Sequence, residues 1–447
     1  MNYVKRRRLT HIRFIAVGYF IMIAIGTVLL MLPFATKSGE SAGFISALFT
    51  AVSSSCVTGL VLHDTATFWS LFGQLVIITL IQIGGLGFMT IALFTTHLLK
   101  QRAGLRERAL MAESINTESL GGMRRLTRII ILGTLIFELG GATILATRFI
   151  PLFGWIKGIY YSVFHAISAF CNAGFDLMGG YSGPYSSLTA FSDDIIINAV
   201  IMFLIIIGGI GFLVWEDIIT HRHHIRRYRL HTKIVLTITA VLIFGGALFL
   251  WLFEIDGVCH GMSIKEQILT SLFGSVTART AGFNTVDSAL ASDSSKFVTI
   301  LLMFVGGSSG STAGGVKTTT VAVIIINLFC YIRGNEAHIF GRKLPENALK
   351  KAVTVISISL AFAICGALFI CVTDNVPIID ALYETFSAVN TVGVTVGITR
   401  DLNTISTLML AFLMYFGRVG SISFALAILE KRSVLPISYP TENITIG

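Results

Sequence analysis

Apolar residues run in long blocks along the chain, and the charged residues collect in the loops between them. Four of these blocks lie at 15–33, 71–93, 195–214 and 353–372. A helix that crosses a bilayer needs about 20 mostly apolar residues, so the pattern predicts several membrane-spanning helices. The first block follows the basic run 5–8, as in a signal peptide. It is too long for a signal peptide and no small-residue cleavage site follows, so we expect a retained first helix.

A shorter pattern occurs four times, in which a half-apolar segment leads to a turn that contains glycine. The segments begin at Ser46, Ser162, Ser271 and Leu382. The turn glycines are Gly59, Gly174, Gly282 and Gly393, spaced by 115, 108 and 111 residues. A further glycine-containing run follows each turn, beginning at Ile83, Ile207, Val305 and Phe416. A recurrence at one period of this kind indicates an internal repeat.

The short segments are too short to cross a membrane. A helix of about 12 residues extends about 18 Å, whereas the hydrocarbon core is about 30 Å thick. Each segment is therefore predicted to enter the membrane as a half-helix and to return through its glycine turn. Irregular backbone is tolerated at that depth only where protein buries it or water reaches it. The alternative is four ordinary extracellular loops that carry helical stubs.

These patterns together predict an all-α polytopic membrane protein with four repeats of helix, pore loop and helix. The repeats are expected at 1–107, 108–228, 229–345 and 346–447. Eight transmembrane spans and four re-entrant half-helices would then surround a central pore.

Composition and charge agree with the membrane prediction. The chain is 54% hydrophobic and only 13% charged, whereas a soluble protein is about 25% charged. The net charge of +9 does not indicate nucleic-acid binding, because 24 of the 33 Lys and Arg residues cluster in alternate loops and near the ends of the chain. The positive-inside rule makes those loops and both termini cytoplasmic. The opposite face carries fourteen acidic residues, Glu384 among them, against seven basic ones. A negative outer face would concentrate cations.

The glycine turns have the chemistry of an ion filter. A dehydrated potassium ion needs oxygens in place of its water, and backbone carbonyls provide them where the chain is free to aim them inward. The ends of the four half-helices would add partial negative charge. The predicted filter loops are Cys56, Val57, Thr58 and Gly59; Cys171, Asn172, Ala173 and Gly174; Arg279, Thr280, Ala281 and Gly282; and Asn390, Thr391, Val392 and Gly393.

On these turns and their spacing, the chain resembles the Trk/Ktr/HKT superfamily of potassium transporters, and most closely the bacterial Ktr membrane subunit. The resemblance covers nearly the whole chain. It implies potassium uptake across the cell membrane through a filter with one glycine from each repeat. It also implies a homodimer whose protomers each contain a pore, docked on a cytosolic nucleotide-binding regulatory ring. Cys56, Cys171 and Asn390 depart from the usual pattern, which leaves sodium permeation and sodium dependence open.

A glycine- and serine-rich segment interrupts the last apolar block of the third repeat. It comprises Gly306, Gly307, Ser308, Ser309, Gly310, Ser311, Thr312, Ala313, Gly314, Gly315 and, after Val316, Lys317. This composition disfavours helix. The segment nearly matches a phosphate-binding loop, but Val316 displaces Lys317 by one position and no strand precedes it. The resemblance implies an intramembrane loop that obstructs the pore below the filter. A kink without a gating role is the alternative.

Arg418 is a charged residue in an apolar segment, where three repeats have Gly85, Gly209 and Gly307. A charge within the membrane is expensive and marks a functional position. The resemblance implies that Arg418 faces the pore just below the filter. The alternative is a structural ion pair with an acidic residue such as Glu138.

Other classes of function find less support in the sequence. His221, His223 and His224 could bind a metal, but they lie in a polybasic loop, where solvent, anionic lipid or a partner protein fits better. No protease, hydrolase or dinucleotide-binding motif occurs, so we expect no enzymatic activity. A secondary symporter would more often show inverted repeats. The membrane potential supplies about 2.3 kcal/mol per charge at 100 mV, enough to drive uptake without an ATP site in this chain.

Overall fold

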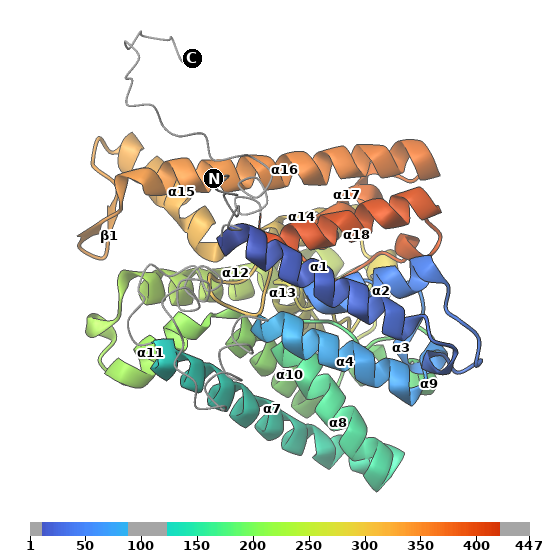
Figure 1. Cartoon of the computed structure of the whole chain (residues 1–447). Helices are drawn as coiled ribbons and strands as arrows, with labels where there is room; N and C mark the ends of the chain where they lie inside the picture. Colours follow the sequence, from blue (N-terminus) through green and yellow to red (C-terminus); the bar gives the residue numbers. More distant parts are fainter. Residues whose placement is uncertain (1–10, 88–122, 421–447) are drawn as a thin grey trace, which may run out of the picture.

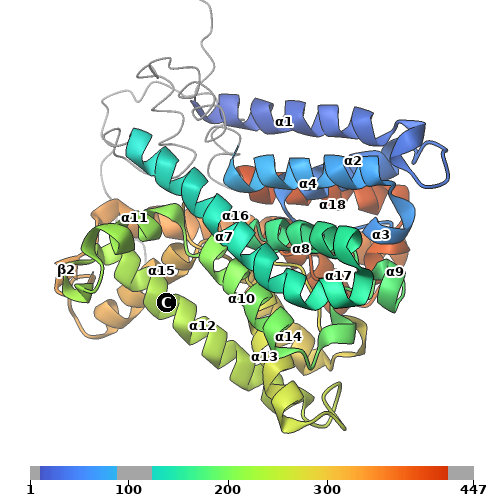
Figure 2. The same cartoon turned by 90° about the horizontal axis from the view of Figure 1, so that it is seen from below.

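The computed structural model describes residues 11–87 and 123–420, and this part of the chain is mostly helical. The long helices lie side by side, and shorter helices pack between them (Figures 1 and 2). This confirms the predicted helical class. Within the same residues, the one sheet is a short antiparallel hairpin formed by β1 (His338–Ile339) and β2 (Arg342–Lys343).

Four consecutive units share a plan of long helix, a shorter helix of 12 to 16 residues that is called the half-helix below, loop and second helix. Unit 1 contains α1 (His11–Leu30), α2 (Phe44–Cys56) and α4 (Leu71–Leu86). Unit 2 contains α7 (Met123–Phe153), α8 (Trp155–Phe170), α10 (Ile195–Gly209) and α11 (Phe212–His221). Unit 3 contains α12 (Leu230–Glu254), α13 (Ile264–Thr277), α14 (Asp293–Phe304) and α15 (Thr318–Ile332). Unit 4 contains α16 (Glu346–Asp374), α17 (Ile378–Val389) and α18 (Thr404–Val419).

Short helices lie in the connections between these elements. They are η1 (Pro33–Ala35), α3 (Thr65–Phe68), α9 (Gly179–Ser182), η2 (Thr189–Phe191), η3 (Ile225–Arg227), η4 (Ser288–Leu290) and η5 (Ile398–Arg400). Helices α3 and α9 lie at one end of the bundle, whereas α11 and the β1–β2 hairpin lie at the other (Figures 1 and 2). The basic segment after α11 and the basic segment around the hairpin therefore share one end of the molecule.

The four units close into a ring through one type of contact. The second helix of each unit packs against the half-helix of the next unit: α4 against α8, α10 against α13, α14 against α17, and α18 against α2. Units 1 and 3 are therefore diagonal to each other, and so are units 2 and 4. The half-helices lie toward the centre of this ring, and the four loops predicted to form the filter, called the filter loops below, follow them.

Helix length gives a clear span assignment for part of the ring. Among the described residues, Arg13–Leu30, Arg125–Phe153, Leu230–Glu254 and Glu346–Asp374 are long and apolar enough to cross a membrane. These are the first helices of the four units. The second helices are shorter: α4 and α18 have 16 residues, α10 has 15 and α14 has 12. The count of eight spans remains a prediction.

The apolar block 195–214 is not one straight helix, contrary to the sequence prediction. Helix α10 ends at Gly209, and α11 begins at Phe212 with a change of direction of 93°. Gly211 adopts a φ of 97° at the break, which a residue with a side chain reaches only with strain. The predicted interruption in unit 3 is confirmed, because α14 ends at Phe304 and α15 begins at Thr318.

The predicted repeat boundaries fall between helices wherever the structure describes them. The boundary at 228/229 directly precedes α12, and that at 345/346 directly precedes α16. The boundary at 107/108 lies outside the described residues. The boundaries themselves remain a prediction.

Candidate functional site

The structure brings the four loop glycines together at the centre of the ring. A Cβ atom built on Gly59 would lie 2.6 Å from the carbonyl oxygen of Ala173, and one on Gly174 would lie 2.6 Å from the Cα of Gly282. A Cβ on Gly393 would overlap the carbonyl oxygen of Thr58. No side chain fits at these contacts without moving a neighbouring loop. The glycines therefore allow four backbone segments to approach one axis.

Each filter loop has two residues in the left-handed region, and the sequence indicated only one of them. The loop glycines have φ values of 105°, 69°, 84° and 90°. The residues two positions earlier, Val57, Asn172, Thr280 and Thr391, have φ values of 57°, 60°, 70° and 51°. Val and Thr rarely adopt this conformation, so their sequence gives no sign of it. A left-handed residue on each side of one with negative φ turns successive carbonyl groups toward the same side, as a row of cation ligands requires.

The half-helices fix the loops through hydrogen bonds that recur between units. The amide of the residue before the glycine donates back to the half-helix in three units: Thr58 to Ser53 O, Ala173 to Ser168 O and Val392 to Ser387 O, each at 2.8 Å. In units 1 and 4 the serine hydroxyl also accepts from the amide of the glycine, at 3.1 Å for Gly59 and 3.0 Å for Gly393. The local geometry of the loops thus repeats together with their sequence.

The first residue of each filter loop is buried, and three of the four contact groups outside their own loop. The Arg279 guanidinium donates to Thr239 Oγ1 on α12 at 3.3 Å. The Cys171 thiol lies 3.7 Å from Gln82 Oε1, and Cys56 is fully buried. The Asn390 side-chain oxygen accepts from the amide of Val316 at 3.2 Å. Within the filter loops, the buried hydroxyls of Thr58 and Thr391 have no hydrogen-bond partner among the described residues.

A cavity of about 730 Å³ lies directly outside the filter loops, and all four loop glycines line it. Its charged lining residues are Asp64, Asp176, Asp287, Asp401 and Arg400. The arginine stacks over the ring of Tyr185 at 3.8 Å. Four carboxylates against one guanidinium make this vestibule acidic. Glu384, counted from sequence among the outer acids, is instead fully buried behind the filter loop of unit 4, because the rest of α17 and the following loop enclose it.

The segment 306–317, called the gate segment below after its predicted role, lies against three filter loops. A Cβ on Gly306 would lie 3.2 Å from Thr280 Cγ2, and one on Gly315 would lie 2.7 Å from the Cα of Asn390. The Thr312 hydroxyl is 3.3 Å from the side-chain amide of Asn172. Units 2, 3 and 4 thus all contact this segment.

Helix α10 holds the gate segment on its other side. The amide of Ser308 donates to Gly209 O at 2.9 Å, and the amide of Phe212 donates to Gly310 O at 2.7 Å. These bonds satisfy backbone groups freed by the break between α10 and α11, so the gate segment stabilises the break. Lys317 donates to the carbonyl oxygens of Ala313 at 2.6 Å and Gly314 at 3.0 Å. It closes the segment on itself, and α14 rather than a strand precedes it.

Arg418 connects the gate segment to unit 1. Its guanidinium donates to the carbonyl oxygens of Thr312 and Gly84, and to Gly85 O at 3.3 Å. Its Nε donates to the hydroxyl of Tyr19 at 3.3 Å. No ion pair joins Arg418 to Glu138 in the described structure. Gln82 donates instead to the Glu138 carboxylate at 3.2 Å, so the described contacts give no support to a structural pair between Arg418 and Glu138.

A known protein family matches this chain through all four units. The family model TrkH, described as a cation transport protein, matches residues 5–434. The chain belongs to the TrkH family. The likeness to curated relatives extends over their whole length as well. The potassium/sodium uptake protein NtpJ of Enterococcus hirae is 40% identical over 99% of this chain and 98% of its own. The Ktr system potassium uptake protein B of Bacillus subtilis is 39% identical over 99% of this chain and 98% of its own length. The Ktr system potassium uptake protein D of the same organism is 34% identical over 97% of this chain and 96% of its own length.

A solved TrkH structure shares the fold. The potassium transporter TrkH from Vibrio parahaemolyticus superposes with a TM-score of 0.73 over 96% of this chain and 87% of that one, at 15% sequence identity. The named relatives are transporters, and none is named as an enzyme. The resemblance to this superfamily, and to the Ktr membrane subunits within it, is therefore confirmed.

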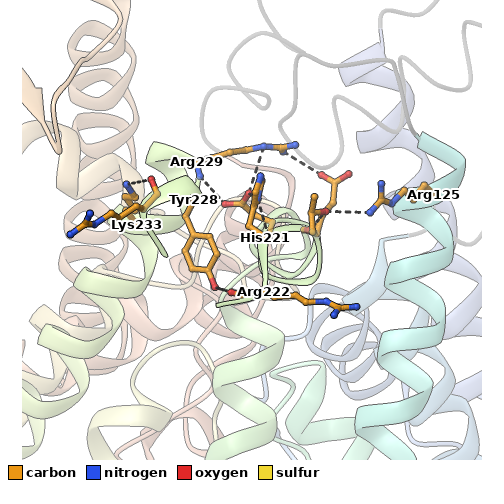
Figure 3. A network of polar contacts seen from close by, with 10 residues as sticks. Arg125, His221, Arg222, Tyr228, Arg229 and Lys233 are labelled. Atoms are coloured by element: carbon orange, nitrogen blue, oxygen red, sulfur yellow. Dashed lines mark hydrogen bonds and ion pairs between the residues drawn. The ribbon is translucent and has the colours of Figure 1, made fainter. Parts of the chain in front are cut away.

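The histidine-rich segment of this TrkH-family chain forms a structured corner between α11 and α12 (Figure 3). Buried Asp217 accepts from His221 Nδ1 at 2.9 Å and from the amide of Arg229 at 2.8 Å. Tyr228 donates through its hydroxyl to Arg222 O at 2.5 Å. No cluster of three or more His, Cys, Asp or Glu residues able to hold a metal occurs in the part of the chain that the structure describes. The metal alternative therefore has no support here.

Proposed function

We propose that this chain carries potassium ions inward across the cell membrane through the centre of the ring of four units. The observation that carries the proposal is the convergence of Gly59, Gly174, Gly282 and Gly393 at the floor of one acidic vestibule. Four closely packed carbonyl-bearing loops at the end of a negatively charged cavity provide what a dehydrating cation needs. The names of the relatives, potassium and potassium/sodium uptake proteins, favour the same ion.

The filter loops 56–59, 171–174, 279–282 and 390–393 form the selectivity filter in this proposal. The unpartnered hydroxyls of Thr58 and Thr391 add oxygens beside the carbonyl row. Sodium remains the second candidate cargo, because one of the relatives is named for both ions. The four half-helices enter the membrane without crossing it, and eight helices cross it.

The gate segment and Arg418 act together below the filter. The gate segment contacts three filter loops, and Arg418 ties it to the carbonyl oxygens of unit 1. A closed pathway therefore contains both a steric obstruction and a fixed positive charge. Opening requires the gate segment to leave these contacts, and we place its control in a cytosolic nucleotide-binding ring of the Ktr type. The chain works as a homodimer in which each protomer has its own pathway.

Orientation and driving force complete the proposal. The basic segments 222–233 and 333–351 share one end of the bundle, and α3, whose first residue Thr65 lines the vestibule, lies at the other end (Figure 1). The positive-inside rule then places both termini in the cytoplasm and the vestibule outside. With the vestibule outside, a negative interior potential draws cations inward, and no ATP site is needed in this chain.

Fluxes through purified protein in liposomes test the function. With an inside-negative potential, potassium influx should exceed sodium influx, and Gly59→Ser should reduce that preference. Gly183→Ser is a matched control, because Gly183 shares the φ of 105°, whereas a Cβ added there would meet no atom within 4 Å, unlike one on Gly59. Equal fluxes of the two ions in the wild type, or equal behaviour of the two serine variants, would contradict the proposal.

A further inference from the structure

Two buried side chains lie behind filter loops at the same place in the repeat. His165 and Glu384 both lie nine residues before their loop glycine, on α8 and α17. The amide of Leu177 donates to His165 Nε2 at 3.3 Å, and the amide of Val396 donates to Glu384 Oε1 at 3.2 Å. Leu177 and Val396 both lie three residues after the glycine. Two different residue types thus accept the same backbone amide.

Further contacts orient both side chains as hydrogen-bond acceptors. His165 Nδ1 lies 2.7 Å from the carbonyl oxygen of Tyr161. That contact requires the proton on Nδ1 and leaves Nε2 as the acceptor. Glu384 also accepts from the hydroxyls of Thr395 and Thr399, the latter at 2.7 Å. Both side chains are fully buried, so water does not replace a lost bond.

In the other two units, the described structure has no such hydrogen bond between the amide after the glycine and a side chain on the half-helix. Their equivalent pairs are Thr50 with Leu62 in unit 1 and Phe273 with Thr285 in unit 3. Phe273 has no acceptor, and no hydrogen bond joins Thr50 to the amide of Leu62 in the described structure. Units 2 and 4 are diagonal in the ring. Filter loops with this hydrogen bond therefore alternate around the centre with loops that lack it.

We propose that His165 and Glu384 are positioning residues that set ion selectivity by holding the outgoing strands of two diagonal filter loops. The inference rests on the proposed function, since it assumes that these loops are the filter. Neither side chain touches the ion. Each fixes the backbone three residues beyond the glycine, and so limits how far the loop carbonyls can widen or contract around a cation.

Paired substitutions separate this role from simple packing. His165→Phe copies unit 3 and removes the acceptor, and Glu384→Leu does the same in unit 4. His165→Gln and Glu384→Gln retain an oxygen that can accept the amide. Phe273→Leu changes packing at the equivalent depth in unit 3 without removing an acceptor. Glu384→Thr, which copies Thr50, provides a second loss variant if Glu384→Leu does not reach the membrane.

The measurement is the ratio of potassium to sodium influx in liposomes, with Gly393→Ser in the same series. The loss variants should lower the ratio by about tenfold, as expected when a buried amide loses its partner, and the glutamine variants by no more than about threefold. Phe273→Leu should leave the ratio unchanged. Loss variants with a wild-type ratio, alongside a lowered ratio for Gly393→Ser, would overturn this inference and leave the filter in place. A wild-type ratio for Gly393→Ser would overturn the filter and this inference together.

Discussion

Arg418 donates a hydrogen bond from its guanidinium to the carbonyl oxygen of Thr312, 106 residues earlier in the chain. The bond links the second helix of unit 4 to the gate segment of unit 3. A charge-assisted bond of this kind contributes about 1.5–3 kcal/mol, and the positive charge itself opposes a nearby cation. If Arg418 acts as proposed, its removal takes away a bond that holds the gate segment and an electrostatic barrier in one step.

Arg418→Ala should raise potassium influx by at least about tenfold, because a bond that contributes about 1.5 kcal/mol to closure corresponds to slightly more than a factor of ten. Arg418→Lys keeps the charge but cannot reach the carbonyl oxygens of Thr312, Gly84 and Gly85 together, so its influx should be intermediate. Isotope influx into liposomes, normalised to the amount of folded protein, is the measurement. An influx for Arg418→Ala at or below that of the wild type would contradict the barrier.

Shortening the gate segment should open the pathway without loss of the fold. At its base, the amide of Gly306 donates to Val316 O at 2.9 Å, and the amide of Thr318 donates to Gly307 O at 3.1 Å. Replacement of 308–315 by a two-glycine turn keeps the residues of both bonds. We expect higher potassium influx and a smaller response to the regulatory ring. If a well-folded deletion variant has unchanged influx, the segment is a passive kink.

The structure shows how far the sequence could lead. The sequence alone predicted the helical class and the convergence of four loops. It did so through the long apolar blocks, the basic loops and the fourfold glycine pattern. The left-handed Val57 and Thr391 were beyond sequence reasoning, because β-branched residues disfavour that conformation and only tertiary contacts hold them there. The proposed roles of His165 and Glu384 depend on a bond between residues 12 positions apart, which no local pattern indicates. Arg418 stood out by its charge, but its partners are carbonyl oxygens and cannot be read from side-chain types.

Asn390 should hold the gate segment in its closed position. Its side-chain oxygen accepts from the amide of Val316 at 3.2 Å, and its nitrogen donates to Phe386 O at 3.0 Å. Asn390→Leu removes both bonds at similar volume, and we expect an increase in potassium influx of about fivefold, the equivalent of one buried hydrogen bond. If Asn390 and Arg418 hold the same segment, the increase in influx of the double variant should be smaller than the product of the two single increases. Strictly multiplicative increases would indicate independent gates.

The acidic vestibule should act on ion entry rather than on selectivity. Asp287 and Asp401 line it and are exposed, whereas Asp64 accepts from the amides of Thr67 and Tyr185 and holds units 1 and 2 together. Asp287→Asn with Asp401→Asn therefore removes charge with little effect on the fold. At low ionic strength, potassium influx from dilute solution should fall by about threefold, because a focused negative field raises the local cation concentration. The deficit should shrink at about 0.15 M salt, where the screening length is about 8 Å, and the ratio of potassium to sodium influx should not change. A deficit that persists in high salt would mean that the two carboxylates bind the ion directly or support the loop structure.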